Sequence, residues 1–190
     1  MKTLPADHDL SHLRLALGRV PENRRRTAVD GGAHTGTWTE VMADAFESVV
    51  AFEPAPDYAE RIPDRENVTV YTVALGKDLA PADLVDGEEN EGQTHVMPPE
   101  GEKGDTWIVP LDAYGLKYVD LLKLDVEGFE HPALLGAKRT IDLCRPWIIV
   151  EVNDLARVHY GQDPRDVHRR LRQWGYRPVE TYNKDHLYAP

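Results

Sequence analysis

The chain has 190 residues, 41% of them hydrophobic and 8% aromatic, which argues against a mainly disordered chain and fits one globular domain spanning residues 1–190. Its formal net charge of −11 disfavours a nucleic-acid partner, because binding to a phosphate backbone is driven by Lys and Arg. A single cysteine, Cys144, excludes an internal disulfide, and the absence of an apolar signal or membrane-length segment leads us to expect a cytoplasmic protein without a membrane partner.

The first half of the chain predicts a helical cover followed by two units of a parallel sheet. Apolar residues at helical spacing over residues 9–20 predict a short helix, and we expect residues 1–26 to cover one edge of the sheet. The basic run at residues 24–26 is expected to be a solvated approach to the first strand. Strands are predicted over residues 27–29, 48–52 and 67–75. The glycine loop at residues 30–36 leads into a helix, and a brief helical segment follows at residues 56–62. Successive strand–helix–strand units imply parallel strands with right-handed crossovers.

The second half begins with an irregular segment. Residues 77–105 are rich in Gly, Pro and acidic residues, and we expect them to form a flap. The nearly continuous apolar run at residues 118–124 predicts a central strand that is buried on both faces. Further elements are predicted as a helix over residues 132–143, a strand over 147–150, a helix from 164 to 174 and a hairpin over 177–188. The fold class is therefore α/β and Rossmann-like, with a mostly parallel sheet and a C-terminal antiparallel hairpin.

Acidic residues directly follow four of the predicted strands. They are Asp30, Glu53, Asp125 and Glu151. Ligands of open α/β sheets bind beyond the carboxyl ends of the strands, so we expect these carboxylates to surround a ligand. Glu53 follows Asp30 at close to the spacing of about 20 residues at which an acid meets a ribose.

The segment Asp30-Gly31-Gly32-Ala33-His34-Thr35-Gly36 is a glycine-rich loop between a strand and a helix. Its missing side chains let backbone amides approach a ligand, although a tight turn alone would also favour glycine. The pattern differs from the G-x-G-x-x-G of dinucleotide sites, and Asp30 would repel a pyrophosphate. The same carboxylate attracts the ammonium and sulfonium groups of S-adenosylmethionine, so the acids favour that cofactor. A nucleotide-dependent oxidoreductase is a less favoured alternative.

Three blocks of the sequence resemble the FkbM-type methyltransferases. They are residues 29–36, residues 51–54 and residues 120–130, and the last block is the most specific. The resemblance covers about residues 27–153. It implies a class I methyltransferase sheet and transfer of a methyl group, commonly to a hydroxyl oxygen of a sugar or small metabolite. His34 departs from the Asn that the family often carries, which bears on the identity of the acceptor.

The resemblance also implies roles for individual residues. The glycine loop should hold the methionine part of the cofactor, Glu53 the ribose, and Ala74 with Leu75 the adenine, while Asp125 should face the sulfonium. The strands that end at Asp30 and Asp125 are neighbours in this topology. We therefore expect these two carboxylates to lie close enough to share one cation.

Transfer to a neutral hydroxyl needs a base, and three side chains are candidates. Glu127 is preferred, followed by His131, because both lie just beyond the central strand, whereas His95 lies in the flap. A carboxylate at a helix start or a solvated histidine would explain the same residues without catalysis.

The sequence leaves two further hypotheses open, a metal site and a non-catalytic function. Asp125, Glu151 and Asn153 offer oxygen ligands at adjacent strand ends, so a divalent metal is an option that is left unassigned. The competing class of function is a non-catalytic Rossmann-like domain that binds a protein partner through its acidic flap. In the methyltransferase reading the partner is a small-molecule or sugar acceptor, and the oligomeric state is open.

Overall fold

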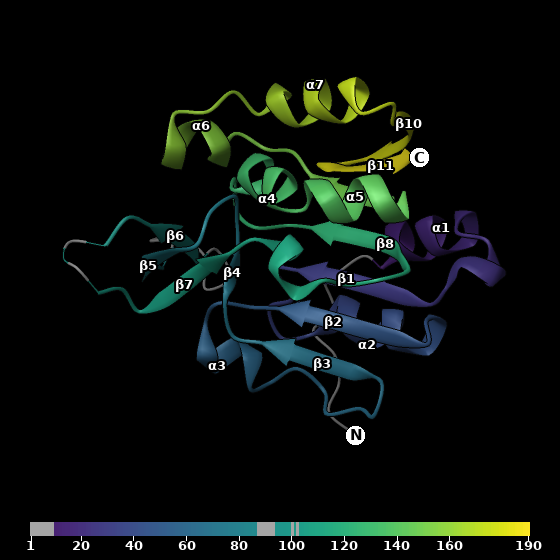
Figure 1. Cartoon of the computed structure of the whole chain (residues 1–190), viewed down its shortest axis with the longest axis horizontal. Coiled ribbons are helices and arrows are strands. Elements are labelled where there is room, and N and C mark those ends of the chain that lie inside the picture. The colour runs from purple at the N-terminus through teal and green to yellow at the C-terminus, as the bar shows by residue number, and fades with distance from the viewer. Residues whose placement is uncertain (1–9, 87–93, 100, 102) are drawn as a thin grey trace.

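The computed structural model describes residues 10–86, 94–99, 101 and 103–190, with the backbone alone for residues 11 and 12. Its main feature is a seven-stranded sheet with the order β10-β11-β9-β8-β1-β2-β3 (Figure 1). The strands are β1 (Thr27–Gly31), β2 (Ser48–Phe52), β3 (Val68–Tyr71), β8 (Val119–Leu124), β9 (Trp147–Glu151), β10 (Arg177–Tyr182) and β11 (Asp185–Ala189). Strands β3, β2, β1, β8 and β9 are parallel, and β11 is antiparallel to β9 and β10. The predicted fold class is confirmed.

Helices cover both faces of this sheet, and the core is divided accordingly. The helices are α1 (Ser11–Arg19), α2 (Thr37–Ala45), α3 (Pro56–Ala59), α4 (Glu130–Gly136), α5 (Lys138–Cys144), α6 (Leu155–Tyr160) and α7 (Arg165–Gln173), with short 3₁₀ turns at Glu22–Arg24 and Leu111–Tyr114. Leu121 of β8 packs on the α1 and α2 side, whereas its neighbour Leu122 packs with residues of α4, α5 and α7. Because both faces are covered, β8 is buried along its whole length, as its apolar run predicts. Helix α1 lies on a face of the sheet, which differs from the predicted edge position.

A second, smaller sheet has the order β4-β7-β5-β6 and lies beside the carboxyl ends of β1, β2 and β8 (Figure 1). Its strands are β4 (Ala74–Leu75), β5 (Ala80–Val85), β6 (His95–Met97) and β7 (Thr106–Val109). The single strand predicted over residues 67–75 is therefore two strands in different sheets. The flap predicted to be irregular over residues 77–105 contains β5 and β6, because β5 finds partners in both β6 and β7 that its own sequence does not reveal. Residues 87–93, 100 and 102 of that segment lie outside the described part.

One predicted helix is divided in two, and another begins and ends close to where the sequence predicts. The helix expected over residues 132–143 is divided into α4 and α5 at Ala137. Gly136, just before the break, packs so closely that a Cβ there would lie 1.9 Å from the carbonyl oxygen of Gly76. Helix α7 begins after Asp163-Pro164, close to the predicted start, and ends before Gly175, whose φ of +80° is typical of the residue that follows a helix.

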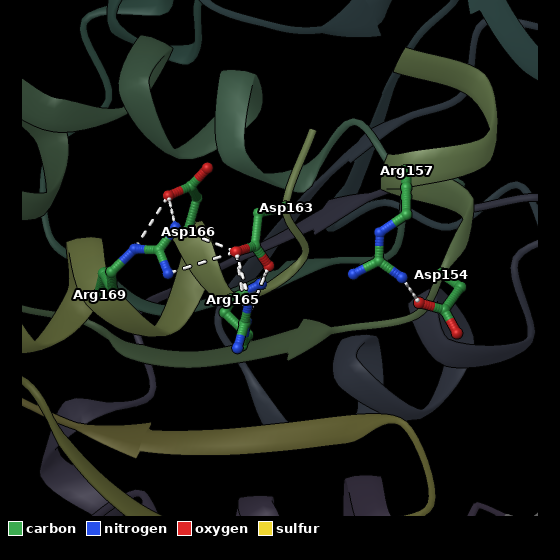
Figure 2. A network of polar contacts seen from close by, with 6 residues as sticks. All are labelled: Asp154, Arg157, Asp163, Arg165, Asp166 and Arg169. Atoms are coloured by element: carbon green, nitrogen blue, oxygen red, sulfur yellow. Dashed lines mark hydrogen bonds and ion pairs between the residues drawn. The ribbon is translucent and has the colours of Figure 1, made fainter. Parts of the chain in front are cut away.

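Ion pairs on the surface surround the connection between α6 and α7 (Figure 2). Asp163 contacts the guanidinium groups of Arg165 at 3.0 Å and Arg169 at 3.3 Å, and Asp166 also contacts Arg169. The two arginine side chains are 73% and 52% exposed, so water screens these pairs and they contribute little to stability. Every helix in the described ranges is too short or too polar to serve as a membrane span.

Candidate active site

A cavity of about 390 Å³ lies at the carboxyl ends of the parallel strands. In sheet order, the ends of β2, β1, β8 and β9 and the start of β11 contribute Glu53, Gly32, Asp125, Glu151 and Asp185 to its wall. With strands about 4.8 Å apart, this row of residues is roughly 19 Å long. The volume falls within the range of roughly 300–1,000 Å³ that is typical of small-molecule sites.

The structure brings together most of the predicted site residues. Those that line the cavity are Gly32, Ala33, His34, Glu53, Ala74, Leu75, Asp125 and Glu127. Those that do not line it are Asp30, Gly31, Thr35, Gly36 and His131.

The glycine loop is tied to the end of β2 by its own amides. The backbone amides of Gly32 and Ala33 both donate to the carbonyl oxygen of Phe52, at 2.9 and 3.1 Å. The next amide, of His34, donates to the Glu53 carboxylate at 2.8 Å. Glu53 is only 5% exposed, and burial raises the pKa of its carboxyl. Three consecutive amides of the loop are thus already paired within the protein.

Three residues of the loop, Gly32, His34 and Gly36, have a left-handed backbone, and the first two shape the cavity. Gly32 has a φ of +76°, and a Cβ there would lie 1.8 Å from the carbonyl oxygen of Asp125, so only glycine lets the loop cross the end of β8. His34 has a φ of 51°, and its ring lies 4.1 Å from that of Tyr58 in α3, measured between centroids. His34 and Tyr58 together form an aromatic wall of the cavity.

The predicted cation between Asp30 and Asp125 is part of the protein itself. Lys123 Nζ lies 3.1 Å from Asp30 Oδ1 and 3.7 Å from Asp125 Oδ2. Asp30 is fully buried, and its other oxygen accepts a hydrogen bond from the Thr39 hydroxyl at 2.6 Å. The expectation that Asp30 faces the ligand is therefore corrected, because its carboxylate is enclosed by Thr39 and Lys123.

The loop after β8 carries Glu127 on a tightly fixed turn. The buried carboxylate of Glu130 accepts hydrogen bonds from the amides of Val126 at 3.0 Å and Gly128 at 3.1 Å. Glu127 and Gly128 have φ values of 54° and 94°, and a Cβ on Gly128 would lie 2.5 Å from the Ala156 nitrogen. This geometry holds the Glu127 side chain at the cavity wall.

Three carboxylates gather at the β9 and β11 end of the cavity. Burial and the Asp125 charge raise the pKa of Glu127 to about 7, that of Asp185 to about 6 and that of Glu151 to about 9. Because burial and the nearby acids both oppose ionisation, Glu151 in particular keeps its proton at neutral pH.

The two histidine candidates have different surroundings. His131 lies on α4 outside the cavity wall, and burial lowers its pKa. His95 lies on β6, is 8% exposed and lines the cavity, with its ring stacked on His159 at 3.8 Å. Of the two, only His95 has access to a ligand in this cavity.

The metal option gains no support from the geometry. The Asn153 side chain donates to the Glu151 carboxylate at 2.5 Å and accepts from the Leu155 amide at 2.9 Å, so both ends of its amide are in use. Over the described ranges, no group of three or more His, Cys, Asp or Glu side chains is placed to hold a metal ion.

Several lining residues were missed by the sequence analysis. They are Thr37, Trp38, Tyr58, Lys123, Phe129, Asn183 and Asp185. Lys123 could have been found, since a lysine inside a doubly buried apolar strand is unusual. Asp185 could not, because it reaches the site only through the register that places it opposite Glu151.

The sheet order, with antiparallel β11 between β9 and β10, together with a cavity at the strand ends, defines a class I methyltransferase fold. A methyltransferase FkbM from Methylobacillus flagellatus KT has a TM-score of 0.61 and 19% identity, over 88% of this chain and 44% of that one. An O-methyltransferase from Bacillus cereus, in complex with SAH, has a TM-score of 0.55 and 17% identity, over 98% and 83% of the two chains. A precorrin 8w decarboxylase from Methanobacterium thermoautotrophicum has a TM-score of 0.54 and 16% identity, over 99% and 92%. At these identities the likeness shows the fold alone.

The family itself is shown by sequence. The profile of the family described as the Methyltransferase FkbM domain matches residues 30–178, and the chain belongs to this family. It spans less than half the length of the Methylobacillus protein. Among curated proteins none matches significantly.

Proposed function

We propose that this protein transfers the methyl group of S-adenosylmethionine to a hydroxyl oxygen of a sugar or another small metabolite. The observation that carries the proposal is the row of side chains across the cavity of an FkbM-family chain. The row runs from the buried Glu53 carboxylate at β2 to the carboxylates Glu151 and Asp185 at β9 and β11. A length of roughly 19 Å leaves room for an adenosyl cofactor and an acceptor side by side.

The residues along this row fit the cofactor part by part. Glu53 would bind the ribose hydroxyls, because each of its carboxylate oxygens can accept a bond in addition to the backbone bond that it already has. Ala74 and Leu75 offer an apolar surface for the adenine. The amides of Gly32 and Ala33 are already bonded to the end of β2, which disfavours a pyrophosphate and therefore a dinucleotide cofactor. When bound, S-adenosylmethionine supplies an electrophilic methyl group.

Glu127 would take the proton of the acceptor hydroxyl. Its pKa of about 7 suits a general base near neutral pH, and the bonds that Glu130 makes to the loop hold it in place. Phe129 and the strand that carries His95 line the same part of the wall and would exclude water from the acceptor.

Calorimetry with S-adenosylmethionine and S-adenosylhomocysteine tests the cofactor assignment. Wild-type protein is expected to bind both, and Glu53→Ala is expected to lose affinity roughly 10- to 100-fold, because a charged hydrogen-bond partner is removed. Glu60→Ala, which changes an exposed glutamate after α3, is the control and should bind as wild type does. Absence of binding by the wild-type protein would refute the proposed function.

A turnover assay tests whether Glu127 is the general base. Glu127→Gln should still bind S-adenosylmethionine, with at most the roughly five-fold loss that removal of its charge causes, but should fail to form S-adenosylhomocysteine when a sugar and metabolite library is supplied. Glu60→Gln should retain turnover. Full turnover in Glu127→Gln would eliminate this carboxylate as the base.

A further inference from the structure

The charged side chains on the cavity wall do not balance. The carboxylates that line it are those of Glu53, Asp125, Glu127, Glu151 and Asp185. Among the lining residues of the described chain, Lys123 is the only lysine or arginine, and it already lies 3.1 Å from Asp30, whose carboxylate is outside the wall. S-adenosylmethionine would add a single net positive charge. The carboxylates on the wall therefore outnumber the cations even with this cofactor bound.

Glu151 and Asp185 form an acidic pair at the β9 and β11 end of the cavity, where they lie opposite each other in the strand register. Burial raises the pKa of Glu151 to about 9, and the charges of three nearby carboxylates add to the effect. They belong to Asp125, Glu127 and Glu130. Lys184 on the hairpin turn opposes the shift, but it is exposed and does not line the cavity. Without a ligand, a proton on Glu151 thus reduces the negative charge of this pair.

A buried histidine of the same cavity lacks a hydrogen-bond partner. His95 lines the cavity and is 8% exposed, and its Nδ1 has no partner among the residues that the structure describes. The Tyr160 hydroxyl fixes this strand, because it donates to the carbonyl oxygen of Val96 at 3.0 Å. Burial, and then the charges of the segment that carries Glu127, raise the pKa of Tyr160, so this wall lies close to the proposed base. A ligand at Glu127 can therefore supply the partner that His95 lacks.

We propose that the acceptor is an amino sugar, whose ammonium group binds between Glu151 and Asp185 while the hydroxyl to be methylated lies at Glu127. This inference rests on the proposed function and narrows its acceptor. The ammonium would take the place of the proton on Glu151, whose carboxylate can accept further hydrogen bonds beside the one from Asn153. His95 would bind a neighbouring hydroxyl of the sugar. The same acids would repel an anionic acceptor such as a sugar phosphate.

Three sugars that differ only at carbon 6 test the charge preference. They are 6-amino-6-deoxy-D-glucose with an ammonium, D-glucose with a hydroxyl and D-glucuronate with a carboxylate. Calorimetry at pH 7, on protein saturated with S-adenosylhomocysteine, should show the amino sugar binding roughly 10-fold tighter than glucose and glucuronate binding most weakly. Absence of amino-sugar binding, or binding no tighter than that of glucose, would overturn the inference. Failure of the protein to bind S-adenosylhomocysteine would instead refute the proposed function.

Glu151→Gln tests whether the preference comes from this pair. The variant should lower the preference for the amino sugar over glucose roughly 10-fold and leave the affinity for S-adenosylhomocysteine unchanged. Asp154→Asn, which changes a 79% exposed acid three residues later, is the matched control and should keep the preference. Equal weakening of both sugars in Glu151→Gln would indicate a merely structural role and contradict the inference.

The displaced proton gives a second readout. Because Glu151 holds a proton at pH 7, binding of the ammonium should release it, and calorimetry in two buffers of different ionisation enthalpy measures the release. Glu151→Gln should abolish the release, and glucose should cause none. Amino-sugar binding without proton release would show that the ammonium lies elsewhere.

His95→Phe tests the contact on the other wall. The variant keeps an aromatic ring against His159, on which His95 stacks at 3.8 Å, but removes both ring nitrogens. It should weaken the amino sugar and glucose by the same factor and retain the proton release, because the two sugars share their ring hydroxyls. A loss confined to the amino sugar would place the ammonium at His95 and overturn its assignment to Glu151 and Asp185.

Discussion

Strand β8 buries one charged side chain near each end, and the two differ in how completely they are paired. At the amino end, Asp120 is fully buried and accepts hydrogen bonds on both oxygens from the Arg26 guanidinium, with further bonds from the Arg26 amide and from Arg24. At the carboxyl end, Lys123 donates to the Gly32 carbonyl oxygen and lies 3.1 Å from Asp30 Oδ1 and 5.6 Å from the centre of the Trp38 ring, and it lines the cavity. A buried charge that is fully paired within the protein holds the fold together, whereas one at a cavity wall can also contact a ligand.

The largest effect should follow from removing the charge at the amino end. Asp120→Asn replaces one acceptor oxygen by an NH₂ group that faces a guanidinium, and we expect a loss of about 3 kcal/mol in the free energy of unfolding. Urea unfolding measures this loss. The affinity for S-adenosylhomocysteine should not change, since Asp120 lies at the opposite end of the strand from the cavity.

Asp163→Asn is the matched control for burial. Asp163 also pairs with two arginines, Arg165 and Arg169, but on the surface (Figure 2). Its substitution should destabilise the protein far less, and less still at high salt. Equal losses in the two variants would show that burial is not what distinguishes Asp120.

A second, smaller effect concerns pH, and the two ends should respond with opposite sign. Hydrogen bonds from Arg26 outweigh the effect of burial and hold the pKa of Asp120 below its ordinary value of 3.8, so its contribution is present above that pH and is lost as pH falls. Burial raises the pKa of Glu127 and Glu151 from 4.5 to about 7 and about 9, so their contribution is present below pH 4.5 and is lost as pH rises through these values. Cofactor-free protein should therefore lose stability between pH 5 and pH 9.

Glu151→Gln tests that loss directly. The variant keeps a similar shape without a charge to ionise, and we expect it to be more stable than wild type by about 1–2 kcal/mol at pH 9 and nearly equal to it at pH 5. Thermal unfolding across this pH range is the measurement. A parallel decline in both proteins would mean that Glu151 is not responsible.

The same contrast explains how much could be predicted from the sequence. The parallel strands of the large sheet follow from local patterns, because a strand buried on both faces must be apolar throughout, as β8 nearly is. The acids at the ends of β2, β8 and β9 were located for the same reason, and Glu53, Asp125 and Glu151 do line the cavity. Their position directly after a predicted strand was sufficient to place these three residues at the cavity.

Partners distant in sequence were not predictable in this way. The basic run at residues 24–26 was expected to be solvated, yet Arg24 and Arg26 bind Asp120, some 95 residues later in the chain. Likewise, Asp30 and Asp125 were expected to share a ligand cation, but Lys123 already lies between them. Charge patterns predict where opposite charges are needed, and only the packed strands show which residue supplies them.

The smallest effect should appear in the choice between the sulfonium cofactor and its thioether product. Raising the pH from 6 to 8 ionises Glu127, which lines the cavity together with Asp125, so the affinity for S-adenosylmethionine relative to S-adenosylhomocysteine should rise by about 1 kcal/mol, or roughly five-fold. Calorimetry at both pH values measures the ratio, and Glu127→Gln should flatten its pH dependence. A ratio independent of pH in the wild-type protein would show that ionisation of Glu127 does not act on the sulfonium.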